Sequence, residues 1–501
     1  NIVIQPDVNI EGNMIMKKSF KEIRKLFLYI FFFILPIFYL LCTTSTRKGV
    51  NKPLRVVVDL EVGESKKVKL INGDVVDLKL VSIVEKRDDV RSAVRVASVK
   101  VVIDGKEITL NSGNYNLPVK VGKVQIDCPI TRGYYTNSKQ DSWGLEKDAR
   151  FRLWPAGSPW IAPGTFVYPV KQRWFASDTQ MGNEPTFVDF GEDPLRKKIY
   201  YHSGLDIGGA EGLVEVLSVV DGTVVSSGEN KIPGYENEPV KIRYDRVILI
   251  DNKGWYYHYS HLYSIEPSIV PGAKVRKGQK IGLLGKEGHS GGFAHLHFEI
   301  KCRQPSGKWG TEDGYAYLWQ SYVNQYKPPL IAVARPHHLA FTGQVVTLDG
   351  RKSKSFEGKI VKYEWTFSDG SKASGPVQER KYELPGTYSE VLKVVDSKGN
   401  VDYDFTVVQI RDRKNPDKMP PSIHACYYPT FNIKPGVPVR FFVRTFLTKV
   451  GNEIWDFGDG SPKVKVKSFV EDVPNRNPIK GKYAETTHKF KKPGRYVVSV
   501  E

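Results

Sequence analysis

The chain has 501 residues, enough for three to five domains that each bury a core. Its formal net charge of +19 is spread along the sequence without a helix-turn-helix, zinc-finger or RNA-binding signature, so no nucleic-acid partner is expected. An anionic cell envelope or a merely soluble basic surface explains the charge, and the spacing of the four cysteines implies no disulfide framework.

The N-terminal segment has the form of an export signal. A basic stretch at 17–25 precedes an apolar run at 26–41, and this charge bias places the rest of the chain across the membrane. The run is marginal in length for spanning a bilayer. Cys42 follows it as in a bacterial lipoprotein cleavage site, although Leu41 is larger than the small residue expected there. A cleaved signal, a lipid anchor and a retained membrane anchor stay open for residues 1–50.

The next segment, at 51–160, alternates apolar and polar side chains, as in Leu54–Leu60 and Val99–Ile103. Together with Asn-Gly and Asp-Gly turn sequences, this alternation predicts a β-rich domain. Its function is unassigned. A spacer and an inhibitory cover over an active site are the two interpretations.

The stretch Gly291–Ile300 carries the strongest chemical signal in the chain. Its period of two predicts a strand with His295 and His297 on one face and with Leu296 and Phe298 directed into a core. Two imidazoles on a pocket-facing strand suit a metal site, where one binds zinc and the other reaches the same water. An H-x-H strand alone fits ordinary packing equally well.

Candidate partners for these histidines lie upstream. His202 and Asp206 belong to a glycine-rich stretch at 201–209, which favours a loop leading into a strand. In an extended chain their i, i+4 spacing leaves both side chains on one face. Two histidines and a carboxylate make a three-ligand set for a catalytic zinc, with the fourth position open for water.

A further histidine cluster lies between these two segments. Residues 254–262 are strand-like and place His261 on the face of Tyr257 and Tyr259, with His258 pointing the other way. Zinc held by two neutral imidazoles and one carboxylate polarises a scissile carbonyl and lowers the pKa of its water. One nearby histidine can take a proton, and another can stabilise an oxyanion or protonate the leaving amine.

The C-terminal part begins with a predicted helix at 314–326, which Pro328-Pro329 ends. Two similar blocks follow, each near the length of an immunoglobulin-like sandwich. The first contains Tyr-Glu-Trp-Thr-Phe-Ser-Asp-Gly around Trp365, and the second contains Ile-Trp-Asp-Phe-Gly-Asp-Gly around Trp455. Both tryptophans are interpreted as core residues and not as sugar platforms.

These motifs together resemble a known family. The order H-x-x-x-D, Y-x-H-L and H-L-H-F-E, with its glycine framework over residues 163–325, resembles the lysostaphin-type zinc metallopeptidases, which cut peptide bonds in bacterial peptidoglycan. The resemblance implies one zinc held by His202, Asp206 and His297, and it implies that His261 and His295 are catalytic. A Phe-Ala approach to the last motif is bulkier than the family's usual stretch and bears on substrate shape. The two C-terminal blocks resemble polycystic-kidney-disease-type (PKD) domains.

We therefore expect a mostly β, multidomain chain with an antiparallel β peptidase domain and immunoglobulin-like β-sandwich repeats. The predicted units are an N-terminal extension with signal or anchor, a β-rich domain, the peptidase domain, a first PKD-like sandwich and a second one: 1–50, 51–160, 161–327, 329–412 and 420–501. The sandwiches are expected to be spacers, because no predicted ligand or catalytic residue lies in them.

The expected function is an exported zinc metalloendopeptidase that hydrolyses peptidoglycan cross-links or stem peptides. Peptidoglycan or another envelope polymer is the expected substrate, and the N-terminal segment is the expected membrane contact. The expected location is the cell envelope or the extracellular space. Two alternatives stay open: a zinc endopeptidase acting on Gly-rich or other extracellular proteins, and a non-catalytic cell-wall-binding regulator or adhesion protein with the same fold.

Overall fold

A computed structural model describes the protein at residues 2–4, 52–113, 115–135, 138, 141–179, 182, 184–187, 199–448, 450–468 and 481–501. The predicted signal or anchor lies outside the described residues, since only strand β1 (Ile2–Ile4) is described there, paired with the last strand of the chain. Among the described residues, no helix has both the length and the apolar character needed to cross a membrane.

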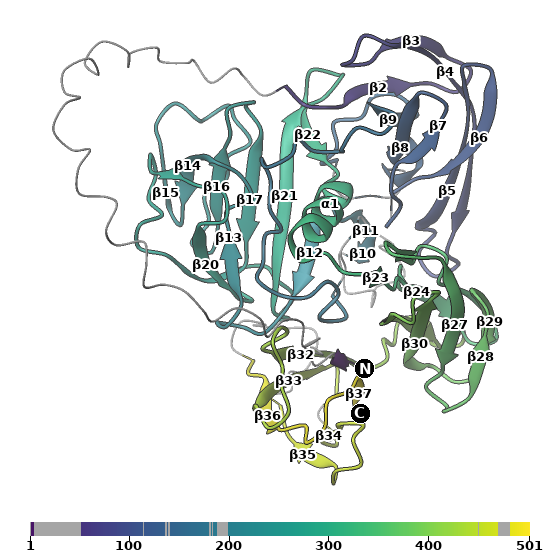
Figure 1. The fold of residues 1–501 in the computed structure, drawn as a ribbon, viewed down its shortest axis with the longest axis vertical. Coiled ribbons are helices and arrows are strands. Elements are labelled where there is room, and N and C mark those ends of the chain that lie inside the picture. Colours follow the sequence, from purple (N-terminus) through teal and green to yellow (C-terminus); the bar gives the residue numbers. More distant parts are fainter. Residues whose placement is uncertain are drawn as a thin grey trace, which may run out of the picture.

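The N-terminal β unit consists of two antiparallel four-stranded sheets, β2-β9-β8-β7 and β3-β4-β5-β6, around a shared core (Figure 1). Their alternation of buried and exposed residues follows the sequence pattern, as strand β4 shows over its first six residues. The strands are β2 Val56–Leu60, β3 Ser65–Lys69, β4 Val75–Arg87, β5 Val94–Ile103, β6 Lys106–Asn111, β7 Val119–Val121, β8 Val124–Thr131 and β9 Ala149–Pro155, with a 3₁₀ turn at Arg132–Tyr135.

The central unit contains an eight-stranded antiparallel sheet, ordered β12-β21-β17-β16-β14-β15 with β19 and β22 at its sides, and a smaller sheet β13-β20-β18. Its elements are β10 Pro185–Phe187, β11 Ile199–Tyr201, β12 Leu205–Gly208, β13 Glu215–Leu217, β14 Gly222–Ser227, β15 Asn230–Lys231, β16 Val247–Ile250, β17 Tyr256–Ser260, β18 Leu262–Ile265, β19 Lys274–Val275, β20 Lys280–Leu284, β21 His295–Arg303, β22 Trp309–Glu312 and α1 Tyr315–Tyr326.

The core of the central unit lies between the large sheet and helix α1. Leu296 and Phe298 of β21 are fully buried there, as the alternation predicts, in one cluster with Leu318 and Trp319 of α1. The predicted closing helix is confirmed, and it ends at Lys327, which adopts a left-handed conformation before the two prolines. Burial of these large side chains holds β21 in place beneath the site described below.

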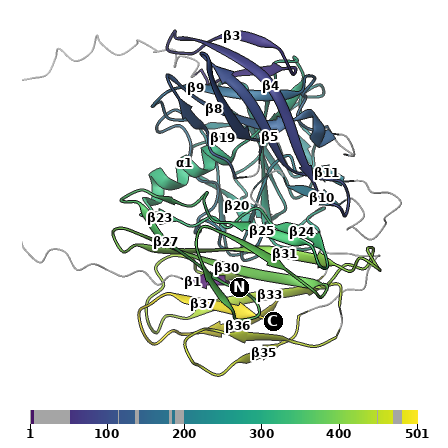
Figure 2. The ribbon, with the colours of Figure 1, turned by 90° about the vertical axis from the view of Figure 1, so that its right-hand side faces the viewer.

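Two β-sandwich units follow, and Figure 2 shows them layered below the central unit. The first contains β23 Leu330–Ile331, β24 His338–Phe341, β25 Val345–Asp349, β26 Lys354–Ser355, β27 Ile360–Thr366, β28 Lys372–Ser374, β29 Val377–Lys381, β30 Gly386–Asp396 and β31 Val401–Arg411. The second contains β32 Ser422–Tyr428, β33 Val439–Phe446, β34 Glu453–Asp456, β35 Val464–Val466, β36 Ala484–His488 and β37 Tyr496–Val500. The prediction of a mostly β, multidomain chain is confirmed.

Each sandwich is built around its predicted tryptophan. Trp365 and Trp455 are fully buried in separate cores, so neither ring is available as a sugar platform. The second sandwich also contributes to the central unit, because Cys426 and Phe442 belong to that unit's core. A spacer would not be expected to share its neighbour's core.

The N-terminal β unit is fixed to the central unit by a buried ionic cluster. Glu312 of β22 accepts hydrogen bonds from Arg55 at 2.7 and 2.8 Å, from Arg152 at 3.0 Å and from Tyr317 at 2.5 Å. Burial alone would raise the pKa of Glu312, but the two guanidinium groups lower it to about 2. The carboxylate therefore remains ionised and compensates two buried cations.

We expect Glu312→Gln to lower the free energy of unfolding at pH 7 by about 3–5 kcal/mol, because it leaves the buried Arg55 without its carboxylate partner, while Arg152 keeps its pair with Asp127. The difference from the unchanged protein should shrink as the pH falls from the ordinary value of 4.5 through about 2, where Glu312 takes up its proton. Urea unfolding measures both effects. Glu64→Gln breaks a partly exposed pair with Lys147 and should cost at most about 1 kcal/mol; equal losses for the two variants would contradict the assignment.

Candidate metal and catalytic site

The central sheet brings the three predicted ligands together. Strand β12 pairs with β21 in a register that places Asp206 opposite His297, while His202 precedes β12 in a short loop. Gly204 lies in that loop, and a Cβ added to it would come within 2.8 Å of the His297 ring. A glycine is therefore required for His202 to approach its partners.

The facing atoms of these residues converge on one point. His202 Nε2 and His297 Nδ1 each lie 3.0 Å from Asp206 Oδ1, and the two nitrogens lie 2.9 Å apart. His202 Nδ1 donates to the carbonyl of Gly204 at 2.8 Å, which leaves Nε2 directed at the other two residues. Among the described residues, these three form the group of histidine, cysteine and carboxylate side chains that could hold a metal ion.

Charge in this group is arranged to receive a cation. Burial acts to raise the pKa of Asp206, but His202 and His295 hold it well below its usual range, so the carboxylate stays ionised. Burial lowers the pKa of His297, which favours the neutral imidazole that a metal needs as a ligand. Burial acts to lower the pKa of His202, but the neighbouring Asp206 carboxylate raises it, so a metal bound there would displace a proton from this ring. With that proton released, the set presents one negative charge and two nitrogen donors in a buried site.

His295 and His261 flank the group from one side. His295 Nδ1 donates to the carbonyl of Phe293 at 3.0 Å, and its Nε2 lies 3.5 Å from Asp206 Oδ2. The ring centroids of His261 and His295 are 4.7 Å apart, and burial lowers the pKa of His295 to about 3. Both rings thus stand beside the candidate ligands without belonging to the converging set.

The position of His261 differs from the prediction. Strand β17 ends at Ser260, and His261 follows it with a φ of 68°, so it does not continue the face of Tyr257 and Tyr259. A tight bend into β18 turns the imidazole toward the site. The alternation of the strand could not reveal this bend, because it depends on one left-handed residue.

Residues that the sequence did not single out hold His261 in place. The carboxylate of Asp245 accepts the backbone N–H of His261 at 2.8 Å and is paired with Arg243. The His261 Nδ1–H donates to the carbonyl of Glu287 at 2.6 Å, which leaves Nε2 free. Arg243 and Asp245 belong to no recognisable sequence motif, because an arginine and an aspartate two residues apart are common in ordinary turns.

Two further residues have structural positions. His258 is buried and lies opposite Glu299 in the pairing of β17 with β21, and burial lowers its pKa to about 3. Glu299 lies on β21, two residues after His297. It is buried, accepts from Thr311 at 2.8 Å and pairs with Lys301 at 2.8 Å, so it is not solvated.

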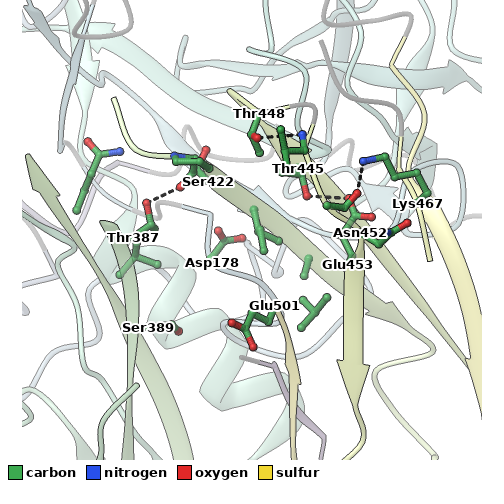
Figure 3. A pocket seen from close by; sticks show the side chains of 18 of the residues that line it. Asp178, Thr387, Ser389, Ser422, Thr445, Thr448, Asn452, Glu453, Lys467 and Glu501 are labelled. Atoms are coloured by element: carbon green, nitrogen blue, oxygen red, sulfur yellow. Dashed lines mark hydrogen bonds between the residues drawn. The ribbon is translucent and has the colours of Figure 1, made fainter. Parts of the chain in front are cut away.

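A cavity of about 340 Å³ opens beside Asp206. Phe293 lines it from the central unit, His337 from the first sandwich, and His424 and Phe446 from the second. A second cavity of about 360 Å³, between the two sandwiches, shares lining residues with the first (Figure 3). The expectation that the sandwiches are only spacers is therefore wrong in one respect: both reach the walls of the cavity at the candidate site.

Comparison with known proteins identifies two of the units. Residues 200–308 match the family model described as Peptidase family M23, and residues 326–410 match the model described as PKD domain. The chain therefore carries an M23 peptidase domain followed by a PKD domain, and the family resemblance drawn from the motifs is confirmed. Assignment of the second sandwich to the PKD family stays a prediction.

Individual relatives match only parts of the chain. Collagenase ColA of Clostridium perfringens is 29% identical over 83 residues, which cover 17% of this chain and 8% of that protein. A microbial collagenase of Vibrio alginolyticus is 30% identical over 110 residues, which cover 20% and 13%. The chain thus spans a small fraction of these relatives. The solution structure of lysostaphin is 16% identical in sequence, with a TM-score of 0.22. The match covers 48% of this chain and 91% of the lysostaphin chain.

Proposed function

We propose, with the M23 peptidase domain as the premise, that this chain is an exported zinc endopeptidase that hydrolyses peptide bonds in peptidoglycan. The observation that carries the proposal is the convergence of His202 Nε2, Asp206 Oδ1 and His297 Nδ1 to within 2.9–3.0 Å, with two more histidines alongside. A regulator that had lost catalysis would not need this complete set.

The donor set fits zinc. Tetrahedral coordination with bonds of about 2.0 Å separates ligand atoms by about 3.3 Å, so the three facing atoms need only a small outward shift. Two nitrogens and one carboxylate oxygen are the ligands of many catalytic zinc sites, in which a water or substrate takes the fourth position. His202, Asp206 and His297 would hold the ion.

The chemistry divides between the ion and the protein. Zinc bound there supplies a Lewis acid that polarises the scissile carbonyl and makes a water more acidic. His295 presents Nε2 to the same space and is neutral at pH 7, because burial lowers its pKa to about 3. His261 also has Nε2 free, because its Nδ1–H is donated to Glu287. One of these nitrogens would accept the proton of the attacking water, and the imidazolium so formed would return that proton from Nε2 to the leaving amine. The other imidazole would donate to the oxyanion only in its protonated form, since its neutral form keeps the single proton on Nδ1.

Location follows from the units that accompany the peptidase. PKD domains and a likeness to bacterial collagenases support an extracellular or secreted protein. The basic and apolar segment at 17–41 supports export, with membrane attachment if it is retained. A net charge of +19 favours residence near an anionic wall polymer.

Digestion of purified cell walls tests the substrate. Walls incubated with the zinc-loaded protein should release peptides with new amino and carboxyl termini at cross-links or stem peptides, which mass spectrometry identifies. Gelatin, tested in parallel, represents the alternative of a Gly-rich extracellular protein, which the likeness to collagenases favours. Cleavage of gelatin with intact walls would overturn the peptidoglycan proposal in favour of that alternative.

A further inference from the structure

The second sandwich forms two hydrogen bonds with the segment that leads into His295. Arg444 Nη1 donates to the carbonyl of Gly292 at 2.5 Å, and the backbone N–H of Ala294 donates to Tyr483 Oη at 2.8 Å. The two contacts lie on either side of Phe293. This bulky residue is where the motif departs from the family's usual stretch.

Tyr483 is itself held by a buried relay. Its hydroxyl lies 2.8 Å from His424 Nδ1, and His424 Nε2 lies 3.0 Å from Thr179 Oγ1 in the central unit. His424 is buried, and burial lowers its pKa, which favours the neutral ring. In the tautomer with its proton on Nε2, the ring accepts from Tyr483 at Nδ1 and donates to Thr179. Tyr483 can then accept the N–H of Ala294 while donating its own proton.

Phe293 connects the hydrogen-bonded segment to His295 through two contacts. The two rings stack with centroids 4.6 Å apart and an interplanar angle of 23°. The carbonyl of Phe293 also accepts the Nδ1–H of His295 at 3.0 Å, which sets the tautomer and leaves Nε2 toward Asp206. Movement of the Phe293 backbone would therefore turn the imidazole away from the reacting atoms.

We propose that the second sandwich is a working part of the peptidase site, in which Tyr483, Arg444 and His424 position His295 through the segment 292–294. Tyr483 is a positioning residue, since it contacts neither the candidate ligands nor the space beside them. The inference rests on the proposed function for its catalytic consequence. The hydrogen bonds from the second sandwich to residues 292–294 can be measured without any hydrolysis.

Tyr483→Phe tests the proposal, because it removes one hydroxyl and keeps the ring. On a small soluble peptide, kcat should fall by up to about 10²-fold, since a small misplacement of a catalytic group is costly. KM should stay near its original value, and zinc content should remain one per chain. The matched control is Tyr496→Phe, which removes a hydroxyl that donates to Lys492 within the same sandwich, and it should leave kcat unchanged.

Amide hydrogen exchange provides the second readout. The N–H of Ala294 should be protected in the unchanged protein and should exchange roughly fivefold faster or more in Tyr483→Phe, because its acceptor is lost. Arg444→Met should speed exchange of the same segment from its other side and lower kcat in the same way. Fast exchange at Ala294 in the unchanged protein, or unaltered kcat in both variants, would overturn the proposal. If no peptide is cleaved even by the unchanged protein, the proposed function fails. The exchange result still decides whether the second sandwich holds the segment 292–294 in place.

Discussion

Replacing Asp206 with alanine should leave the protein without bound zinc and without measurable peptide hydrolysis. Asp206 is the charged member of the converging set, and its Oδ1 lies 3.0 Å from both facing nitrogens. Its loss removes the negative charge that offsets a buried cation, and two neutral imidazoles alone bind zinc weakly. His202→Ala and His297→Ala should also reduce occupancy sharply, because each removes one of the two nitrogen donors.

Metal analysis after gel filtration measures the effect, with hydrolysis of a small peptide followed on the same samples. Asp221→Ala is the matched control, because it removes an exposed carboxylate of the same unit and should keep one zinc per chain. Unchanged zinc content in all three ligand variants would refute the assignment of the site.

A second large effect is expected when the flanking histidines are replaced. His295→Ala and His261→Ala should each keep zinc but lower kcat by about 10²–10⁴-fold, the range of general acid–base contributions. Neither imidazole belongs to the converging set, although both stand within reach of its open side. His289→Ala, at an exposed position, should leave kcat and zinc content unchanged.

Zinc content and kcat must be measured on the same variants, because the two histidines of the strand differ only in their predicted roles. If His295→Ala loses the metal while His297→Ala retains it, the roles within the H-x-H pair are reversed. If His295→Ala and His261→Ala keep the kcat of the unchanged protein, as is expected for His289→Ala, neither flanking histidine takes part in the reaction.

The sequence predicts the strand that carries His295 and His297 because alternation with period two is a local property of the chain. Its partner strand could also be anticipated, since the glycines around Asp206 exclude a helix. The orientation of His261 could not, because it depends on one left-handed residue after the strand. Arg243 and Asp245 were missed because they support His261 from a loop without any chemical motif.

Contacts between the structural units could not be predicted from the sequence. Tyr483 and Ala294 are 189 residues apart, and no periodicity connects them. The sandwich pattern around Trp455 predicted its core correctly but gave no information on which neighbour its surface meets. The Phe-Ala departure in the motif was the one visible sign, and its meaning appeared only when Phe293 was placed between the second sandwich and His295.

Titration of the metal-free protein with zinc tests the central claim most directly. We predict that hydrolysis of a small peptide is absent without metal, rises in proportion to added zinc and reaches its plateau at one equivalent per chain, because His202, Asp206 and His297 form a single site. Full activity of the metal-free protein, or no activity at one equivalent of bound zinc, would contradict the account.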